Sequence, residues 1–242
     1  TQGVSSAASD VYKRQAVWNE KEQTLMLARD FFGIKPVYYA EIDGHFVFAS
    51  EIKSILAFPG YERKVNQKAL EQYLSFQYSP LEETFFKGIY KLMPGHMLLY
   101  KNGSYEIKTY FKPKLTPGQW NHKTNMAQLR SQLSEILKDS VKHHMLSDVE
   151  VGAFLSGGVD SGYLASSSGA DQAFTVGFDE GDRYSEVNKA AKVAEKAGLK
   201  HHVKIISKQE FWDALPDVMY HMDEPLADAS AVALYFLSLI HI

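Results

Sequence analysis

The 242-residue sequence contains no cysteine, which excludes a disulfide framework, a thiolate metal site and a cysteine nucleophile within these residues. It has no excess of positive charge either, because 26 lysines and arginines stand against 29 aspartates and glutamates. A basic surface for nucleic acid or anionic membranes is therefore not expected. No apolar run reaches the roughly 20 residues that span a bilayer, and no secretory signal pattern opens the chain. We expect a cytoplasmic protein with neither a membrane nor a nucleic-acid partner.

Apolar residues, by contrast, are plentiful. The sequence is 45% hydrophobic and 13% aromatic, enough to bury one core and to supply a second. It starts without a methionine and stops inside the apolar run "LSLIHI". We therefore expect a piece of a longer protein and interpret residues 1–15 as a non-native or disordered tail.

The first half of the chain is dominated by short apolar or alternating runs, which predict strands at 24–30, 37–42, 45–50 and within 96–110. Asp43-Gly44 and Asn102-Gly103 each separate two such runs and predict tight hairpins. Helices are predicted at 51–58 and 67–76, the second capped by Asn66. Residues 16–113 thus indicate an antiparallel sheet domain with helices.

Residues 114–125 concentrate proline, glycine and polar side chains and predict a linker. After it, a helix at about 126–146 is expected to start at Asn125. Strands and helices then alternate, which predicts βαβ units with a parallel sheet over 126–242. The expected strands are 151–155, 173–178 and 201–207; the expected helices begin at Ser161, at Ser185 with Gly198 after the last turn, and after a Ser207/Glu210 capping box.

The turn after the first of these strands reads LSGGVDS, residues 155–161. At the carboxyl end of a parallel strand, a glycine turn that leads into a helix presents backbone N–H groups and the positive end of the helix dipole. Gly157 and Gly158 allow close approach of a phosphate, and Ser156 and Ser161 add hydroxyl donors. The pattern predicts an anion site, although it matches neither usual phosphate-loop motif.

A carboxylate beside a phosphate repels it unless a hard cation bridges the two. We therefore interpret Asp160 as a ligand of Mg²⁺. The competing interpretation is a purely structural glycine-rich turn capped by Ser161.

LSGGVDS after an apolar strand resembles the PP-loop of the N-type ATP pyrophosphatase superfamily. The first half resembles the later part of the class II glutamine amidotransferase domain of bacterial glutamine-hydrolysing asparagine synthetases, and the two domains follow each other in that family's order. The segments that carry this second resemblance are LARDFFGIKPVYY (27–39), FVFASEIKSILAFPG (46–60), ALEQYLSFQYSP (69–80) and FKGIYKLMPGHMLLY (86–100). The resemblance implies a partial Ntn-type α+β domain followed by a partial adenine nucleotide alpha hydrolase-like domain.

The resemblance also implies a reaction: glutamine yields ammonia in one domain, and in the other aspartate is activated by ATP as β-aspartyl-AMP before ammonia displaces AMP. It places Leu155 and Val176 against the nucleotide. The family's cysteine nucleophile and its S-G-E-G-[SA]-D-E segment are both missing from this sequence. We therefore name no catalytic residue and expect the chain as given to be inactive.

Alternatives stay open at this point. An asparagine synthetase-like enzyme could use another carboxylate, in β-lactam formation or cell-surface amidation, and a catalytically dead nucleotide-binding module would keep the loop without turnover. The resemblance is compatible with a homodimer of the longer protein.

Several further polar residues have two interpretations each. Arg29 and Asp30 fit either coupling between the domains or a buried ion pair. Asp223 and Glu224 could handle metal or aspartate, as could Asp228, which is also a good N-cap. The adjacent pairs His143-His144 and His201-His202 make poor chelators, because neighbouring side chains point in different directions.

Overall fold

The computed structural model describes residues 13–114, 125–145, 147, 149–179, 186–225, 227–228 and 230–241. These residues form two compact units. The first contains the described residues up to 114 together with 222–225 and 227, and the second contains the remainder. The division is not contiguous in sequence, since a short segment from the second half of the chain belongs to the first unit. The predicted linker lies almost entirely outside the described residues.

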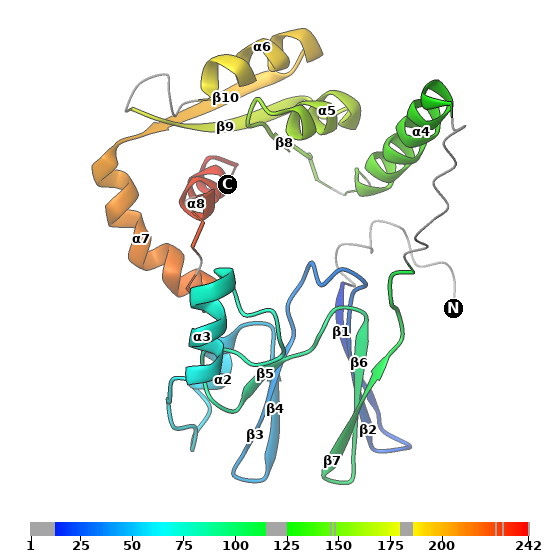
Figure 1. Cartoon of the computed structure of the whole chain (residues 1–242), viewed down its shortest axis with the longest axis vertical. Coiled ribbons are helices and arrows are strands. Elements are labelled where there is room, and N and C mark those ends of the chain that lie inside the picture. Colours follow the sequence, from blue (N-terminus) through cyan, green and yellow to red (C-terminus); the bar gives the residue numbers. More distant parts are fainter. Residues whose placement is uncertain are drawn as a thin grey trace. The chain divides into compact units, whose positions relative to one another are not determined.

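The first unit contains two antiparallel sheets (Figure 1). In one sheet the strand order is β1-β2-β6-β7, and in the other it is β4-β3-β5. The strands are β1 (Arg14–Asn19), β2 (Thr24–Arg29), β3 (Tyr38–Ile42), β4 (His45–Ala49), β5 (Ile89–Lys91), β6 (His96–Lys101) and β7 (Ser104–Thr109). Arg14 and Gln15, which we assigned to the tail, are the first two residues of β1.

Both predicted hairpins are confirmed. Asp43 and Gly44 have φ values of 48° and 77°, and Asn102 and Gly103 have values of 52° and 79°. Two consecutive positive φ angles are what a two-residue hairpin turn requires, and Asn, Asp and Gly are the residues that adopt them at least cost. Each turn therefore fixes the register of the strands on either side of it.

Two helices complete the first unit, α2 (Ile52–Leu56) and α3 (Gln67–Phe76). Asn66 precedes α3 as predicted, but its side chain does not cap the helix. Instead its amide Nδ2 donates to the carbonyl oxygen of Thr84 at 3.1 Å. The predicted capping bond was wrong because a partner distant in sequence takes up the side chain.

Aromatic rings are prominent in the core of the first unit. Tyr39 on β3 is buried and lies 5.7 Å from Tyr90 and 5.5 Å from Tyr105 between ring centroids. Leu27 and Leu98 are also buried and face each other across β2 and β6. Stacked and edge-on rings of this kind contribute specific geometry as well as buried apolar area.

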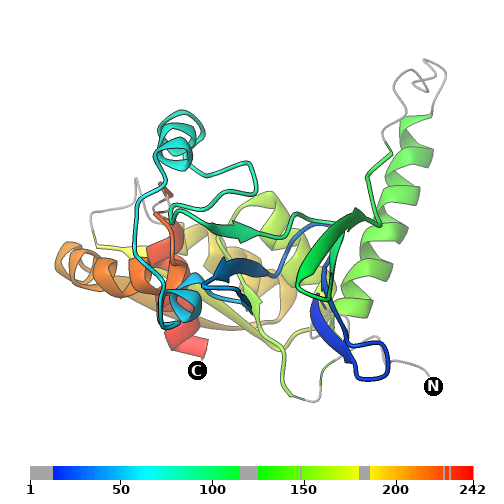
Figure 2. The ribbon, with the colours of Figure 1, turned by 90° about the horizontal axis from the view of Figure 1, so that it is seen from below.

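The second unit contains a parallel three-stranded sheet in the order β10-β9-β8. Helix α6 packs on one side of β9 and β10 and α8 on the other (Figure 1), and Figure 2 shows the same elements from below. The elements are α4 (Met126–His144), β8 (Ala153–Phe154), α5 (Val159–Ser168), β9 (Gln172–Phe178), α6 (Val187–Ala197), β10 (Lys200–Ile206), α7 (Lys208–Met222) and α8 (Ser230–His241).

The helix boundaries of the second unit follow local chemistry. Asn125 accepts from the Ala127 N–H at 2.9 Å at the start of α4. Ser207 and Glu210 form the predicted capping box, with the Ser207 N–H donating to Glu210 and the Glu210 N–H donating to Ser207. Gly198 ends α6 in the left-handed conformation, with φ of 69°.

Small residues fill the centre of the second unit. Ala165, Ala173, Ala190 and Ala194 are buried around Leu155. Short side chains at these positions let helices and strands approach each other closely, which brings the start of α6 up to the loop after β8. The structure thus combines antiparallel sheets in one unit with a parallel α/β arrangement in the other.

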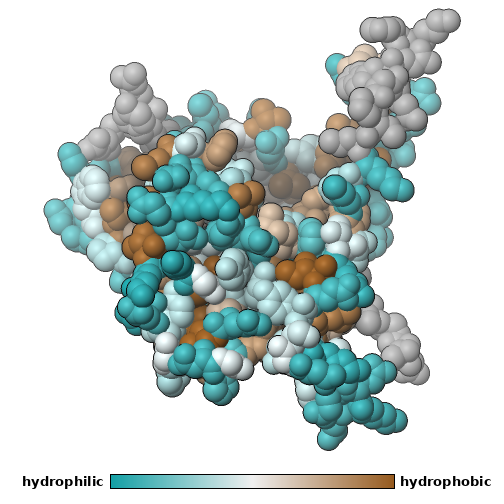
Figure 3. Space-filling model, turned by 60° about the horizontal axis from the view of Figure 1, so that its bottom comes forward, coloured by the Kyte–Doolittle hydropathy of each residue, from teal (hydrophilic) through white to brown (hydrophobic). Residues whose placement is uncertain are grey.

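Hydrophilic residues are interspersed with apolar ones over the face shown in Figure 3. Of the helices in the described part of the chain, none is both long enough and apolar enough to span a bilayer.

Candidate functional site

The loop between β8 and α5 is built around Gly157, whose φ is 76°. A Cβ at this position would lie 2.8 Å from Cβ of Lys189 and 2.9 Å from the backbone nitrogen of Ala190. Side chains rarely adopt this backbone conformation, and the space for one is already taken by the first turn of α6. The loop therefore needs glycine here because it lies directly against a second helix N-terminus.

Two serine hydroxyls form hydrogen bonds within the loop. The Oγ atoms of Ser156 and Ser161 lie 2.8 Å apart, and the Ser156 N–H donates to Oγ of Ser161 at 3.2 Å. Helix α5 begins at Val159 with Gly158 as its N-cap, two residues earlier than predicted. Ser161 consequently stabilises the loop from within the first turn and is not the cap. The hydroxyls are held at the mouth of the loop, where a phosphate oxygen could exchange for these internal bonds.

Asp160 occupies the first turn of α5 and is exposed. Within the described residues, its carboxylate makes no hydrogen bond or ion pair. The described residues also contain no group of three or more histidine, aspartate or glutamate side chains placed to share a metal ion. In proteins Mg²⁺ usually binds through one or two carboxylates, with the remaining oxygens from water and substrate phosphates, and a lone exposed carboxylate could serve in this way.

A cavity of about 550 Å³ opens beside this loop within the second unit. Four of the seven predicted site residues line it: Leu155, Ser156, Ser161 and Val176. Gly157, Gly158 and Asp160 belong to the same loop but are not among the lining residues. The lining residues that our sequence analysis did not identify are Phe154, Phe178, Glu186, Ser230, Ala233, Leu234 and Leu237.

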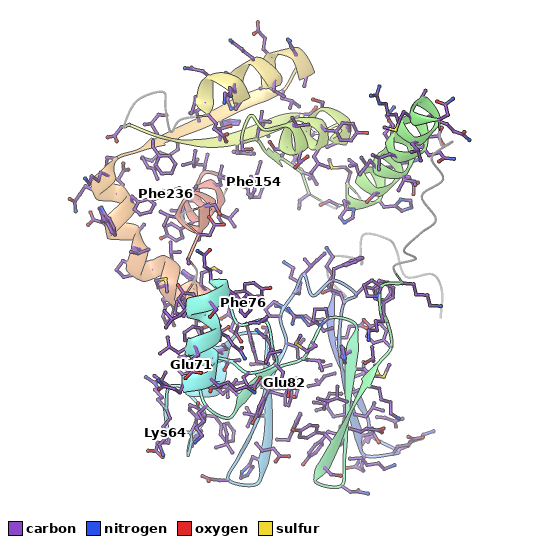
Figure 4. The ribbon with its side chains drawn as sticks, in the orientation of Figure 1. Lys64, Glu71, Phe76, Glu82, Phe154 and Phe236 are labelled. Atoms are coloured by element: carbon purple, nitrogen blue, oxygen red, sulfur yellow. The ribbon has the colours of Figure 1, made fainter. Side chains whose placement is uncertain are left out.

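The lining of the cavity combines apolar side chains with a few polar ones. Ser156 and Ser161 come from the loop, whereas Val176 and Phe178 come from β9 and Leu234 from α8. In Figure 4, Phe154 marks the β8 side of this region, and Phe236 of α8 extends toward α7. Cavities of several hundred Å³ with apolar walls and a few convergent polar groups are typical small-molecule sites.

The strand that precedes the loop is held by a chain of hydrogen bonds from β9 and β10. The Thr175 hydroxyl donates to the carbonyl oxygen of Leu155 at 2.6 Å. Its single proton is thereby used, so Nε2 of His201, at 2.7 Å, must donate to Thr175. Burial lowers the pKa of His201, which favours the neutral ring. His201 therefore supports the loop and is committed to an internal partner.

Arg29 and Asp30, for which a buried ion pair was one interpretation, both bind backbone groups of the turn that follows β2, and Arg29 also binds Leu92. Arg29 donates to the carbonyl oxygens of Lys35, Leu92 and Gly33 at 2.7–3.0 Å. Asp30 accepts from three backbone N–H groups at 3.0–3.2 Å. These bonds hold the pKa of Asp30 below its ordinary value although burial opposes them. Both residues organise this turn.

The acidic residues at 223, 224 and 228 separate in the structure. Asp228 caps α8, with its Oδ1 accepting from the Ser230 N–H at 2.9 Å, as its N-cap interpretation predicts. Asp223 and Glu224 belong to the first unit and accept from backbone N–H groups there. The three carboxylates do not form one cluster.

Comparison with known families assigns both halves of the chain. Residues 14–111 match the family model described as Glutamine amidotransferase domain, and residues 132–240 match the one described as Asparagine synthase. The order of the two matches is the order that the sequence resemblance implies.

Curated relatives agree with the family matches. The chain is 38% identical over 227 residues to "Asparagine synthetase [glutamine-hydrolyzing] 1" of Bacillus subtilis, covering 92% of this chain and 35% of that protein. It is 29% identical over 236 residues to "Amidase chyE" of Penicillium rubens, covering 89% of this chain and 34% of that protein. The chain thus spans about a third of the length of these relatives.

Among solved structures, the chain is similar to a glutamine-dependent NAD+ synthetase from Acinetobacter baumannii in complex with ADP. The TM-score is 0.32 at 14% identity, and the match covers 94% of this chain and 57% of that chain.

Proposed function

Since the chain belongs to the family of glutamine-hydrolysing asparagine synthetases, we propose that its 155–161 loop binds the pyrophosphate end of ATP. The longer enzyme would convert aspartate, glutamine and ATP to asparagine, glutamate, AMP and pyrophosphate through β-aspartyl-AMP. Ammonia from glutamine, or free ammonia, would displace AMP. The chain as given contributes part of each of the two domains.

The observation that carries this proposal is the cavity beside the loop. It joins a hydroxyl-bearing glycine turn, at the N-terminus of α5, to an apolar space of nucleotide size. Backbone N–H groups at a helix start stabilise negative charge, and the charge that grows on the leaving pyrophosphate is what such a loop can stabilise. An adenine needs an apolar wall, which Leu155 and Val176 can offer.

In this proposal each loop residue has one task. Gly157 and Gly158 let the phosphates approach the backbone, and Ser156 and Ser161 donate their hydroxyls to phosphate oxygens. Asp160 would hold Mg²⁺, whose charge offsets the repulsion between carboxylate and phosphates. The first unit would belong to the glutaminase half, although these 242 residues hold no cysteine to serve as its nucleophile.

Calorimetric titration of the chain with ATP, with and without Mg²⁺, tests the nucleotide site. We expect Mg²⁺-dependent binding that is lost in Asp160→Asn. The matched control is Asp217→Asn, which makes the same change at an exposed aspartate of α7 in the same unit. Equal ATP affinity for Asp160→Asn and wild type in the presence of Mg²⁺ would remove the assignment of Asp160.

A second candidate function keeps the nucleotide chemistry and changes the acceptor. The similarity to a protein named as an amidase favours this second candidate. Pyrophosphate release by the longer protein, supplied with ATP, ammonium and one carboxylate at a time, separates the two: dependence on aspartate supports asparagine synthesis. ATP binding without pyrophosphate release on any carboxylate would instead indicate a nucleotide-binding module.

A further inference from the structure

Strand β8 of the second unit ends at Phe154, whereas its neighbour β9 continues further along the sheet. Just past this end, the Leu155 N–H donates to the carbonyl oxygen of Phe174 at 2.9 Å. In a regular parallel ladder the Leu155 carbonyl would next accept from a backbone N–H of β9. It accepts from the side-chain hydroxyl of Thr175 at 2.6 Å. A side chain thus binds the carbonyl group at which the ladder would continue, where the chain turns into the loop.

The contact between Thr175 and Leu155 is closed to solvent. Both residues are 2% exposed. Removal of the hydroxyl would leave a buried carbonyl without this donor, and water could not readily take its place. The strand can therefore leave the sheet here because the Thr175 side chain binds the carbonyl that it carries away.

His201 on β10 decides where the Thr175 hydroxyl sends its proton. A threonine hydroxyl has one proton to donate, and Nε2 of His201 lies 2.7 Å from its oxygen. If Nε2 carries the ring proton, it donates to the hydroxyl oxygen, and the hydroxyl proton is left for Leu155. If Nδ1 carries it, Nε2 competes with Leu155 for that proton. The bond to Leu155 therefore depends on the Nε2–H form of the ring.

The carbonyl held in this way belongs to the first residue of the 155–161 loop. Ser156 follows it directly, and Gly157 packs against the first turn of α6. Leu155 and Ser156 line the cavity, whereas neither Thr175 nor His201 is among its lining residues. A shift of the Leu155 carbonyl is therefore passed through the backbone to the hydroxyl and the glycine of the loop.

We propose that Thr175 and His201 are positioning residues for ATP: the imidazole directs the hydroxyl to the Leu155 carbonyl, and that bond sets where the loop leaves the sheet. Both side chains act through the loop and do not touch the nucleotide. This gives His201 a role other than metal binding. The expected effect on ATP rests on the function proposed above, whereas the direction of the two hydrogen bonds does not.

ATP titration combined with amide hydrogen exchange of the 242-residue chain tests the proposal. Thr175→Val removes the hydroxyl with little change of volume, whereas Thr175→Ser keeps it. We expect Thr175→Val to weaken Mg²⁺-dependent ATP binding about tenfold and to speed exchange of the Leu155 amide about tenfold, the size expected when a buried hydrogen bond is lost. Thr175→Ser should restore both toward the wild-type values.

The matched control is Thr84→Val. Thr84 is also buried, and its hydroxyl donates to the carbonyl oxygen of Ile89 at 2.9 Å in the first unit. The variant loses a bond of the same kind away from the loop, so we expect wild-type ATP affinity and wild-type exchange at Leu155.

The direction of the bonds has a spectroscopic test. Long-range ¹H–¹⁵N spectra of the chain labelled at histidine distinguish the two neutral ring forms, and we expect the Nε2–H form for His201. His201→Gln keeps an amide donor near the position of Nε2 and should bind ATP as wild type does. His201→Leu removes the donor and should weaken binding, by less than Thr175→Val does because the hydroxyl remains.

The outcomes are distinguishable. An Nδ1–H ring at His201 in wild type, or wild-type ATP affinity in Thr175→Val, would overturn the proposal. If wild type binds no ATP, the proposed nucleotide function fails, and the ring form together with exchange at Leu155 still decides whether the pair holds the start of the loop. If Thr175→Val does not fold, His201→Leu compared with His201→Gln supplies the ATP measurement.

Discussion

The loop at 155–161 and the turn at 223–225 look alike in sequence, since each places an aspartate in a short polar connection beside a helix. In the structure they differ. Asp160 is exposed beside a cavity with its carboxylate unengaged among the described residues, whereas Asp223 is buried and its oxygens accept from two backbone N–H groups. A carboxylate that is already bound cannot serve a ligand without losing those bonds. The comparison separates a residue available for chemistry from one used to hold the fold.

The largest expected effect concerns the backbone of the loop. Gly157→Ala should lower the free energy of unfolding by about 3 kcal/mol, because it adds left-handed strain and a contact with the first turn of α6. Urea unfolding measures this, with Gly103→Ala as a control, where a Cβ meets nothing within 4 Å and only the strain applies. Equal losses for the two variants would mean that close packing against α6 is not what requires glycine. The positive φ of Gly157 would then account for the loss by itself.

The second-largest expected effect concerns the turn at 223–225. Asp223→Ala should cost about 2 kcal/mol in the free energy of unfolding, since it removes the cap that Asp223 provides at the start of α2 and leaves buried N–H groups without their acceptor. Asp223→Gly relieves the strain of the left-handed backbone, whose φ is 63°, and removes the same acceptors. The difference between the two variants therefore measures the strain less the greater unfolded-chain entropy of glycine. A change below about 0.5 kcal/mol for both would contradict the structural role of this carboxylate.

Asp160→Asn should behave in the opposite way. We expect at least a tenfold loss of Mg²⁺-dependent ATP affinity, equivalent to about 1.4 kcal/mol, with the free energy of unfolding unchanged to within about 0.5 kcal/mol. Calorimetric titration and urea unfolding of one preparation provide both numbers. A loss of stability without a loss of affinity would remove the contrast between the two aspartates.

The smallest effect is a pH dependence at Glu224. Because burial raises the pKa of this carboxyl in the folded state, its contribution to stability is present below the unfolded pKa of about 4.3 and is lost as pH rises through the folded value. Glu224→Gln keeps an acceptor for the Phe85 N–H and removes the titration. Near neutral pH the variant should be as stable as wild type, or more stable by less than about 1 kcal/mol. Toward pH 4.5 its stability should fall relative to that of wild type.

Unfolding curves between pH 4.5 and 7 measure that slope. Glu71→Gln, on an exposed position of α3 (Figure 4), is the matched control and should follow wild type. A difference between Glu224→Gln and wild type that does not vary with pH would show that the Glu224 carboxyl does not titrate in this range.

Local chemistry was readable from the sequence wherever the partner lies within a few residues. The hairpin turns at 43–44 and 102–103, the caps at Asn125 and Asp228, and the capping box at Ser207 all depend on neighbours in the chain, and the structure shows each of them. The three-residue strand β5 was not predicted because so short a run has no measurable periodicity.

Contacts between residues that are distant in the sequence could not be predicted from it. The sequence offers no signal that Asn66 would bind Thr84, nor that the cap of α2 would come from Asp223. At the candidate site, Ser156 and Ser161 could be named from the chemistry of the glycine turn, and Leu155 and Val176 from the family resemblance. Leu234 and Leu237 could not, because only the path of the chain beneath the sheet brings α8 to the cavity.

The cap of α2 also has a consequence for synthesis. The donor Ile52 and the acceptor Asp223 are 171 positions apart. At roughly 5–20 residues per second on the ribosome, some 10 to 30 s pass after Ile52 is made before Asp223 exists. During that interval α2 lacks this cap, because Asp223 is made only after most of the second unit has been translated.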